Sequence, residues 1–560
     1  MQLRFRSFPE QAENALRAAG LSPIEARVYA ARGIGDVGEL DVELKRLLPY
    51  QQLLNAEKAA IRLADAIAGQ ERILIVADYD ADGATACAVG LRGLRAMGAV
   101  VDFLVPNRFE YGYGLTPEIV DLAAKAAPRL IVTVDNGIAS VAGVERARQL
   151  GIEVLVTDHH LPGDALPAAL IVNPNQPGCP FPSKALAGVG VMFYVLLALR
   201  AELRNRQAFT GQTEPNLASL LDLVALGTVA DVARLDANNR ILVQQGLRRM
   251  RAGKACMGIL SLFRAAGRDH RRASAFDLGF TLGPRLNAAG RLDDMTLGIV
   301  CLSHDDPDVT DAAAQRLDLF NRERRVIEAH IQEAAQAVLE AIKVDDRYSL
   351  CLYDPTWHQG VVGIVASRLK DRHHRPAMVF AKGGDDEIKG SGRSTAGLHL
   401  RDALDLVAKQ HPGLLRKFGG HAAAAGVTLA EADLPRFAEA FEAVCRDCMG
   451  KEDLDRLVET DGELAPEDIS LPLAECFDAQ VWGQGFPQPL FVGEFRVVQQ
   501  RVVGEKHLKL KLAAHDGRMF EAMRFQHAEP LPAQIHAVYR LSVNEYNGSR
   551  LLQLLIEHCL

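Results

Sequence analysis

The sequence lacks any apolar run of the roughly 18 to 20 residues that a membrane-spanning helix needs. Its first twenty residues, MQLRFRSFPEQAENALRAAG, also lack the apolar stretch of a secretory signal. Both absences favour a cytoplasmic protein without membrane contact. Cysteine is sparse: the nine cysteines are scattered over 560 residues, and the close pair Cys445 and Cys448 has no second pair to complete a zinc site. We therefore expect reduced thiols.

The chain also lacks an excess of positive charge. Its formal net charge is −8, so a polyanionic partner would have to be held by local basic clusters or by bound cations. We find no internal repeat and no low-complexity tract. The hydrophobic content of 48% and the charged content of 24% are typical of a globular protein with a sizeable core. At roughly 150 residues per domain, this length predicts three or four domains.

The patterns along the chain predict five segments, and the first three are a helical cap, an α/β domain and a long helix. Residues 1–70 are expected to form a helical cap without strands. In residues 71–306, apolar runs such as ILIVAD and LIVTVDN alternate with amphipathic stretches, which is typical of an α/β domain with a doubly wound parallel sheet. Its later part is expected to hold helices over 187–250 and then a Gly- and Arg-rich loop, FTLGPRLNAAGRLDD. Residues 307–345 predict one long connecting helix.

The last two segments predict a smaller α/β domain and a barrel. Residues 346–455 contain strand patterns in SLCLYD, AMVFA and IKGSGRS. Residues 456–560 contain five strand patterns separated by turn signals such as HDG and NGS, which suits a small OB-like β-barrel.

Acidic and imidazole side chains follow the apolar runs of the first sheet. They are Asp78, Asp80, Asp82, Asp135, Asp158, His159 and His160. Because all strands of a parallel sheet point the same way, these strand ends should meet at one edge, where such folds bind their ligands. Asp231, after LVALGTVA, could join them.

Such a cluster of acids needs a cation. Carboxylates about 4 Å apart repel one another by roughly 4 kcal/mol per pair at an effective dielectric near 20, and a divalent ion removes that cost. Oxygen ligands with a single imidazole favour Mn²⁺ or Mg²⁺ over zinc. Five or more anionic ligands suit two ions, and two-metal sites hydrolyse phosphoesters.

Simpler interpretations of these motifs exist. The stretch from Asp78 to Gly83 matches the first half of an EF-hand loop, but position twelve is Val89 instead of Glu, and the loop follows a strand. It also resembles the DxDx[TV] loop of haloacid-dehalogenase phosphatases, but position five is Ala84. An isolated His pair is more often structural, and Asp231 alone could be a helix cap or a surface acid.

Several arginines lie in Gly-rich sequence, where backbone N–H groups and a guanidinium can hold phosphate oxygens. They are Arg108 in PNRFEYGYGL, Arg285 and Arg291 in GPRLNAAGRL, and Arg393 in KGSGRSTAG. The alternative is that these glycines only form turns. Trp357 and His358 could stack on a ligand or merely pack.

Nine sequence blocks together resemble one family. In chain order they are VADYDADGATA, VPNRFEYGYGL, TVDNGI, VTDHH, LVALGTVADV, GPRLNAAGR, WHQGVVGIVASRL, GSGRS and FGGHAAAAG. In this order and over nearly the whole chain, they resemble the RecJ family of single-stranded-DNA exonucleases in the DHH phosphoesterase superfamily. The resemblance makes 71–306 the DHH catalytic domain, 346–455 the DHH-associated domain and 456–560 the nucleic-acid-binding barrel.

This resemblance implies an exonuclease of DNA repair and recombination that removes 5′-mononucleotides from single-stranded DNA in the 5′→3′ direction, with two Mn²⁺ or Mg²⁺ ions. The family's metal ligands correspond to Asp80, Asp82, Asp135, His159 and Asp231, with Asp135 bridging the ions. Asp78 and His160 are assigned to support and substrate contact in catalysis, and His160 is the candidate proton donor. The grip on the 5′-phosphate corresponds to Arg108, Ser391 and Arg393.

Further contacts and partners are expected on the same grounds. Arg285, Asn287 and Arg291 are expected to contact the nucleic acid. The barrel is expected to hold the downstream strand through basic and aromatic residues such as Arg496, Lys506, Lys509, Lys511, Arg524, Tyr539 and Tyr546. Kinship implies single-strand-binding protein and repair helicases as partners, and we expect a monomer.

Two other classes of function compete with this interpretation. A DHH oligoribonuclease, cyclic-dinucleotide phosphodiesterase or pyrophosphatase would share the acid cluster, but such relatives are typically shorter and lack the terminal barrel. A non-enzymatic scaffold of similar fold would have lost the acidic ligands, which are intact here.

Overall fold

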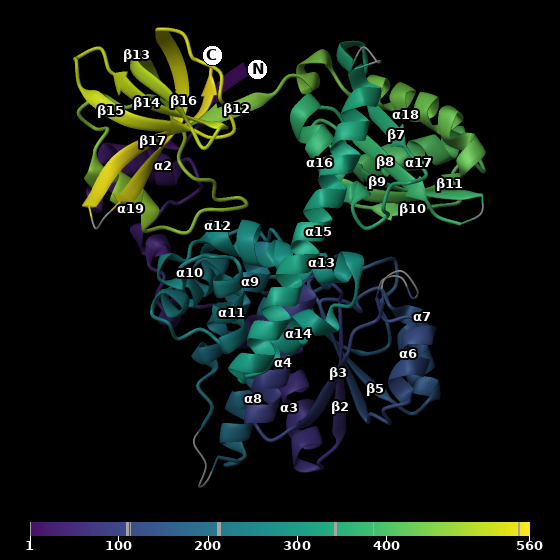
Figure 1. Ribbon diagram of the computed structural model, residues 1–560. Helices are drawn as coiled ribbons and strands as arrows, with labels where there is room; N and C mark the ends of the chain where they lie inside the picture. Colours follow the sequence, from purple (N-terminus) through teal and green to yellow (C-terminus); the bar gives the residue numbers. More distant parts are fainter. Residues whose placement is uncertain are drawn as a thin grey trace. The chain divides into compact units, whose positions relative to one another are not determined.

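Five parallel strands form the sheet on which the acidic strand ends lie. The computed structural model describes residues 2–107, 111, 114–209, 214–340, 344–384, 386–546 and 549–560 (Figure 1). The strands are β2 (Arg72–Ala77), β3 (Val100–Leu104), β4 (Leu130–Val134), β5 (Glu153–Thr157) and β6 (Leu170–Val172). Their order is β3-β2-β4-β5-β6, and every neighbouring pair is parallel. The prediction of a doubly wound parallel sheet is confirmed.

Helices cover both faces of this sheet. Its helices are α3 (Ala56–Ala68), α4 (Ala81–Ala96), α6 (Pro117–Ala124), α7 (Val141–Gln149) and α8 (Gly188–Asn205). Side chains of α6 and α7 pack on one face against β2, β4 and β5, and α4 and α8 contact the same strands from the other face. With both faces covered, β4 is buried along its whole length, which explains why four of its five residues are apolar.

The segment expected to be a Gly- and Arg-rich loop is helical instead. Its elements are α11 (Met257–Ala265), α12 (Ala275–Asp277), a π-helical turn η6 (Leu278–Leu282), α13 (Gly283–Leu292) and α14 (Thr296–Ser303). Before it, the expected helices over 187–250 include α9 (Leu221–Ala230) and α10 (Ala237–Arg251). Glycine suggested a loop, but here it lets helices pack closely: a Cβ on Gly290 would lie 1.9 Å from the carbonyl oxygen of Tyr79.

The chain divides into two compact units. One consists of Met1–Arg4 and Leu319–Val458, and the other of Phe5–Asp318 and Glu459–Leu560. The predicted connecting helix is present as α15 (Pro307–Glu340). The boundary between the two units falls within this helix, between Asp318 and Leu319.

The smaller unit holds a mixed sheet of order β10-β11-β9-β8-β7, in which only β7 and β8 are parallel. Its main elements are β7 (Leu350–Tyr353), α16 (Val362–His373), β8 (Ala377–Lys382), β9 (Glu387–Arg393), α17 (Leu400–Gln410), β10 (Lys417–Gly420), β11 (Ala424–Ala430) and α18 (Leu434–Cys448). Trp357 is buried in the core of this unit, so it packs and does not offer its ring to a ligand.

The larger unit ends in a closed five-stranded barrel, as predicted (Figure 1, yellow strands). Its strands are β13 (Phe491–Val503), β14 (His507–Ala513), β15 (Met519–Arg524), β16 (Gln534–Tyr546) and β17 (Ser549–Cys559), and α19 (Leu471–Asp478) precedes them. Tyr539 is fully buried in the barrel core, because its strand position faces inward, so the expectation that it stacks on DNA is wrong. The side chain of Tyr546 lies outside the described residues.

The N-terminal segment departs from the helical expectation at its start. It contains β1 (Gln2–Phe5) before α1 (Glu10–Ala18) and α2 (Pro23–Ala30), with 3-10 turns before α3. The strand forms because its backbone bonds to a distant strand, β12 (Leu457–Thr460). Gln2 N donates to the carbonyl oxygen of Arg456, just before β12, and Arg6 N donates to that of Thr460, the last residue of β12. A local pattern of four residues could not reveal that pairing.

Two expectations about absent features have structural counterparts. All nine cysteines are free thiols. Within the part of the chain that the structure describes, every helix is too short or too polar to span a bilayer.

Candidate metal centre

The acidic strand ends meet where the sheet order reverses. The chain passes from β2 to β3 on one side and to β4 on the other, so the carboxyl ends of β2 and β4 flank the switch point, where open α/β sheets bind their ligands. Asp78 directly follows β2, and Asp135 directly follows β4 with a left-handed backbone (φ 62°). The predicted convergence is confirmed.

The ligand atoms lie close together around His159. Its Nε2 is 3.0 Å from Oδ1 of Asp135 and 3.9 Å from Oδ2 of both Asp82 and Asp231. Three groups each have potential ligand atoms within 4.8 Å of one another, namely Asp135, His159 and His160; Asp82, His159 and Asp231; and Asp78, Asp80 and Asp135. All five residues predicted as ligands are brought together, and Asp78 and His160 lie with them.

Two helix N-termini hold the acids of the first loop. Asp80 caps α4, and its Oδ1 accepts hydrogen bonds from the backbone N–H groups of Asp82 and Gly83. Asp82 accepts hydrogen bonds from the N–H groups of Gly188 (2.7 Å) and Val189 (2.9 Å) in the first turn of α8. The partial positive charge of each helix N-terminus therefore favours negative charge here.

Asp158 is a positioning residue, a role that the sequence did not reveal. Its carboxylate accepts hydrogen bonds from the backbone N–H groups of Ile138, His159 and His160, and it lies 2.8 Å from Nδ1 of the His160 ring. Burial alone would raise the pKa of Asp158, but its bond to His160 and the backbone bonds hold that pKa below the ordinary value. Asp158 therefore stays charged and orients the His160 ring.

Mutual repulsion acts on the remaining acids. Burial and the charge of Asp80 raise the pKa of Asp82 to about 7, although two backbone hydrogen bonds oppose this. Burial and the neighbouring carboxylates also raise the pKa values of Asp135 and Asp231 well above the ordinary value. A divalent cation among these groups would lower all three pKa values again, because an opposite charge favours the ionised carboxylates.

The two histidines have opposite electrostatic environments. Burial, and the charge of His160, lower the pKa of His159 to about 4, so its ring is neutral at pH 7 and can offer an Nε2 lone pair to a cation. For His160, burial opposes protonation, but the bond to Asp158 and the charges of Asp158 and Asp78 outweigh it and raise the pKa to about 9.

These residues fit a pair of hard divalent cations. The donor set consists of carboxylate oxygens and one neutral imidazole nitrogen, which Mn²⁺ and Mg²⁺ accept. Asp135 belongs both to the group with Asp78 and Asp80 and to the groups around His159, as a bridging ligand should.

The residues expected to contact nucleic acid from GPRLNAAGR lie on α13, not on a loop. Arg285 is buried: Nη2 lies 2.8 Å from Oδ1 of Asp318, and Nη1 donates to the carbonyl oxygen of Thr281. Asn287 accepts a hydrogen bond from the N–H of Ala81 (2.8 Å) and so supports the loop that carries Asp80 and Asp82. Arg291 lies half-buried in the last turn of α13.

Two of the three residues expected to hold the 5′-phosphate lie in the described part of the chain. Arg108 lies outside the described residues. Ser391 and Arg393 lie half-buried on β9 of the smaller unit. A Cβ on Gly363, in the first turn of α16, would lie 3.2 Å from Nη2 of Arg393 and 3.5 Å from Oγ of Ser391. A hydroxyl, a guanidinium and a helix N-terminus are thus gathered, a combination that suits an anion.

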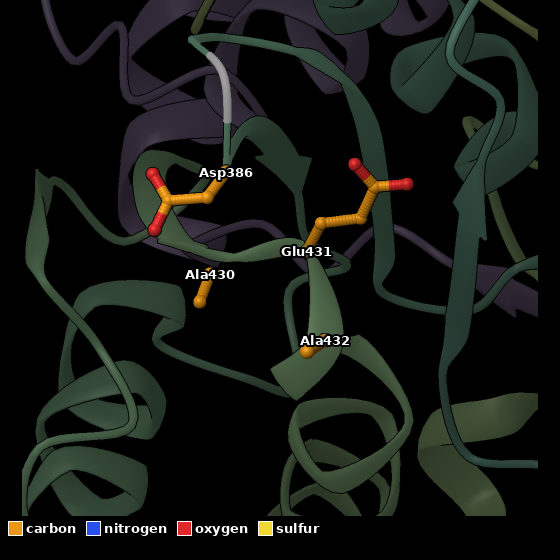
Figure 2. Close-up of a pocket in the computed structure, with 4 residues that line it drawn as sticks. All are labelled: Asp386, Ala430, Glu431 and Ala432. Atoms are coloured by element: carbon orange, nitrogen blue, oxygen red, sulfur yellow. The ribbon is translucent and has the colours of Figure 1, made fainter.

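A separate hollow in the smaller unit is lined by Asp386, Ala430, Glu431 and Ala432, and has a volume of about 460 Å³ (Figure 2). Its charged groups are carboxylates, and Asp386 is bound by Arg416 at 2.6 Å. Negative charge would repel a phosphate backbone, so this hollow does not belong to a nucleic-acid site.

Comparisons with known proteins match three parts of the chain to known domain families. Residues 72–228 match the DHH family, N-terminal domain, residues 332–447 match the DHHA1 domain, and residues 460–558 match the RecJ OB domain. The chain is 48% identical to the single-stranded-DNA-specific exonuclease RecJ of Escherichia coli K12, over 100% of this chain and 99% of the relative. It is 51% identical to the exonuclease of the same name from Dickeya dadantii, over 95% of each chain.

A solved structure shares the whole fold. The crystal structure of RecJ in complex with Mn²⁺ from Thermus thermophilus matches 100% of this chain and 79% of its own, with a TM-score of 0.84 and 31% identity. The structure of that protein with Mg²⁺ matches with a TM-score of 0.78. The α/β fold with a DHH domain, a DHHA1 domain and an OB barrel is therefore shared, and the chain belongs to the RecJ family of the DHH phosphoesterases.

Proposed function

We propose that this protein is a divalent-cation-dependent exonuclease that degrades single-stranded DNA from its 5′ end and releases 5′-mononucleotides. The observation that carries the proposal is the cluster of potential ligands at the switch point of the sheet in a RecJ-family chain. Asp80, Asp82, Asp135, His159 and Asp231 would hold two Mn²⁺ or Mg²⁺ ions. Bound there, the ions supply Lewis acidity for hydrolysis of the first internucleotide phosphodiester.

His160 acts beside these ligands on the leaving group. Asp158 fixes its ring and keeps it protonated at neutral pH, because the bond between them raises the pKa of His160 to about 9. A charged imidazole can donate a hydrogen bond to a phosphate oxygen and a proton to the departing 3′ oxygen. Asp78, next to Asp80 and Asp135, supports the ligand cluster.

The 5′ end is held by Ser391, Arg393 and Arg108 in this proposal. A terminal phosphate has one more ionisable oxygen than an internal one, so a guanidinium with a hydroxyl can select it. A site that selects the end of the strand explains removal of one nucleotide at a time.

The barrel supports the same substrate. Arg501 and Lys509 are directly opposite one another on β13 and β14, and like charges in that arrangement destabilise a sheet unless an anion lies nearby. Glu521 compensates one of them, with its Oε2 at 3.2 Å from Nζ of Lys509. Arg496, Lys506 and Lys511 are exposed on the same two strands or on the turn that joins them, and give the barrel a basic surface for a phosphate backbone.

The test follows an oligonucleotide labelled at either end. With Mn²⁺, a 5′ label should appear at once in mononucleotides, whereas a 3′ label should pass through progressively shorter oligomers. Chelation and Asp135→Ala should each abolish cleavage, while Asp121→Asn, at an exposed acid on α6, should leave it unchanged. Mononucleotides released first from the 3′ end, or cleavage that survives chelation, would contradict the proposal.

A further inference from the structure

Two exposed phenylalanines form a stacked pair in the catalytic unit. Phe276 and Phe280 are 61% and 66% exposed, and their ring centroids are 4.9 Å apart with an interplanar angle of 26°. They lie four residues apart on the continuous helix that runs through α12 and η6, whose other side is anchored by the buried Leu278 and Leu282. Folding ordinarily buries rings of this size, so such a pair on a fixed helix is an unusual apolar surface.

This helix lies against the metal centre. A Cβ on Gly279 would be 3.4 Å from Cγ1 of Val229, and a Cβ on Gly283 would be 3.0 Å from Cβ of Ala230, so η6 and the start of α13 pack on the last turn of α9. Asp231 is the next residue after that turn. Further along the same helix, Asn287 binds the N–H of Ala81 in the acidic loop.

The residue after Asp231 is also an exposed apolar residue. Val232 is 63% exposed and has a φ of 60°, a left-handed conformation that is costly for a β-branched side chain. The hydrogen bonds from Ala233 N to Thr228 O and from Val232 N to Val229 O fix that conformation, because they end α9 in a position usually taken by glycine. Strain of this kind is typical of functional sites.

Basic residues precede the aromatic pair. We call residues 268–272 the basic turn; it contains Arg268, Arg271 and Arg272, which are exposed, and the half-exposed His270. Its one acid, Asp269, lies 2.9 Å from Nη2 of Arg271, so the turn keeps a net positive charge. Arg272 also lies 3.1 Å from Glu545 on β16, which joins this turn to the barrel. Three features therefore follow one another along the chain: Arg272, which contacts the barrel, then the aromatic pair, and then Asn287, which contacts the acidic loop.

We propose that Phe276 and Phe280 form a base-stacking platform that holds nucleotides of the single-stranded substrate between the barrel and the metal centre. The proposal rests on the exonuclease function proposed above and assigns residues to substrate positioning. Every base has an apolar face, so stacking on these rings tolerates any sequence, and the basic turn attracts the backbone of the same strand. A protein partner would also fit an apolar surface, but the adjoining arginines, and the divalent cations that the acid cluster would hold in the proposed function, favour a polyanion.

Binding measurements test the platform. Fluorescence anisotropy with a 5′-phosphorylated dT 12-mer in chelator should show about 10- to 100-fold weaker binding by the Phe276→Ala, Phe280→Ala double variant. The matched leucine double variant should be nearly as weak, because it keeps apolar area without a ring, whereas the tryptophan double variant should bind like the wild type. Ile61→Ala, at an exposed apolar residue on α3, should have no effect.

Two further readouts separate stacking from a merely structural role. With Mn²⁺, the alanine double variant should raise KM while kcat stays within about twofold of the wild type. With an abasic oligonucleotide of the same length, wild type and variant should bind equally, and 2-aminopurine placed a few nucleotides from the 5′ end should lose its quenching in the variant. Circular dichroism of each variant monitors folding.

Three outcomes would contradict the platform and leave the proposed exonuclease function unaffected. The alanine double variant could bind the oligonucleotide as tightly as the wild type, it could lose as much affinity for abasic DNA, or the leucine double variant could bind fully. A wild-type protein that forms dimers through this surface, and loses them in the alanine variant, would assign the rings to a second copy of the chain. If the wild type does not cleave single-stranded DNA at all, the proposed function fails and the platform fails with it.

Discussion

Gly188 leaves no space for a side chain in front of Asp135. A Cβ at residue 188 would lie 2.7 Å from both Cβ and Oδ1 of Asp135, well inside van der Waals contact. The same glycine donates its N–H to Asp82. One small residue at the start of α8 therefore sets the separation of two acids, one in the first turn of α4 and the other at the end of β4.

Gly188→Ala should strongly reduce nuclease activity because the methyl group must displace the Asp135 carboxylate. Overpacking of this kind also costs about 1 to 3 kcal/mol of stability. Steady-state cleavage with a Mn²⁺ titration should show a lower kcat and a higher Mn²⁺ requirement. Gly35→Ala, at an exposed glycine with open space around it, is the control and should behave like the wild type. Normal Mn²⁺ dependence in Gly188→Ala would contradict this account.

Metal binding should become more stabilising as the pH rises from about 4 to 7. Asp82 has a folded-state pKa of about 7 against an ordinary value of 3.8, so the folded metal-free protein retains a proton that the unfolded chain has released. The stability that this proton gives to the folded metal-free protein is complete below pH 3.8 and disappears as the pH rises through 7. Mn²⁺ competes with the same proton for the carboxylate.

The measurement is Tm with Mn²⁺ and with chelator between pH 5 and 8. The Mn²⁺-induced increase in Tm should grow over this range in the wild type and should be smaller and flatter in Asp82→Asn. His160 has a separate effect on the metal-free protein: its pKa is raised from 6.5 to about 9, so its stabilisation is lost across that interval and the Tm in chelator should fall there. An Mn²⁺ effect that shrinks as the pH rises would refute the assignment.

Arg32 should be essential for stability although it is remote from the metal centre. Its guanidinium binds the carboxylate of Asp461 at 2.7 and 3.0 Å, and neither side chain is exposed. Arg32→Ala leaves a buried acid with less compensation, which typically costs about 3 to 5 kcal/mol. Urea denaturation should show this loss, whereas Arg17→Ala, which removes an exposed pair with Glu13, should change stability by less than about 1 kcal/mol.

Asn287→Ala should lower kcat without weakening DNA binding. Asn287 accepts the N–H of Ala81, so its loss frees the loop that holds Asp80 and Asp82, and a net hydrogen bond of this kind contributes about 1 kcal/mol. We expect roughly a 5- to 10-fold decrease in kcat with unchanged anisotropy on the dT 12-mer. Equal losses in binding and in turnover would instead favour the direct nucleic-acid contact expected from the sequence.

The parallel sheet and its acid cluster could be predicted because they depend on local patterns and on one topological rule. Each buried strand is an apolar run with a polar residue at its end, and parallel strands deliver those ends to one edge. Asp78 and Asp135 are such residues. Asp231 is harder to place from the sequence, since it ends a helix, and only the packing of α9 on α4 and α8 brings it within 3.9 Å of His159.

Other features depend on contacts that no local pattern contains. The glycines of GPRLNAAGR suggested a loop, but Gly283 and Gly290 are needed for close contact with Ala230 and with Tyr79. The sequence around Arg285 predicts a phosphate ligand, but Asp318, on α15, binds its guanidinium instead. Asp158 follows a strand as the sequence predicts, but its role as the anchor of His160 depends on the path of the loop.

The burial of Val28 among barrel residues such as Phe491 and Leu510 has a consequence for biosynthesis. Helix α2 packs on α1 at once, but its Val28 acquires the barrel neighbours only after the chain has left the ribosome beyond β13, close to the end of synthesis. During that interval its apolar side must be left uncovered or shielded by a chaperone. A nascent chain stalled before residue 459 should therefore be cleaved by protease near α2, at a site that is protected once the barrel has closed.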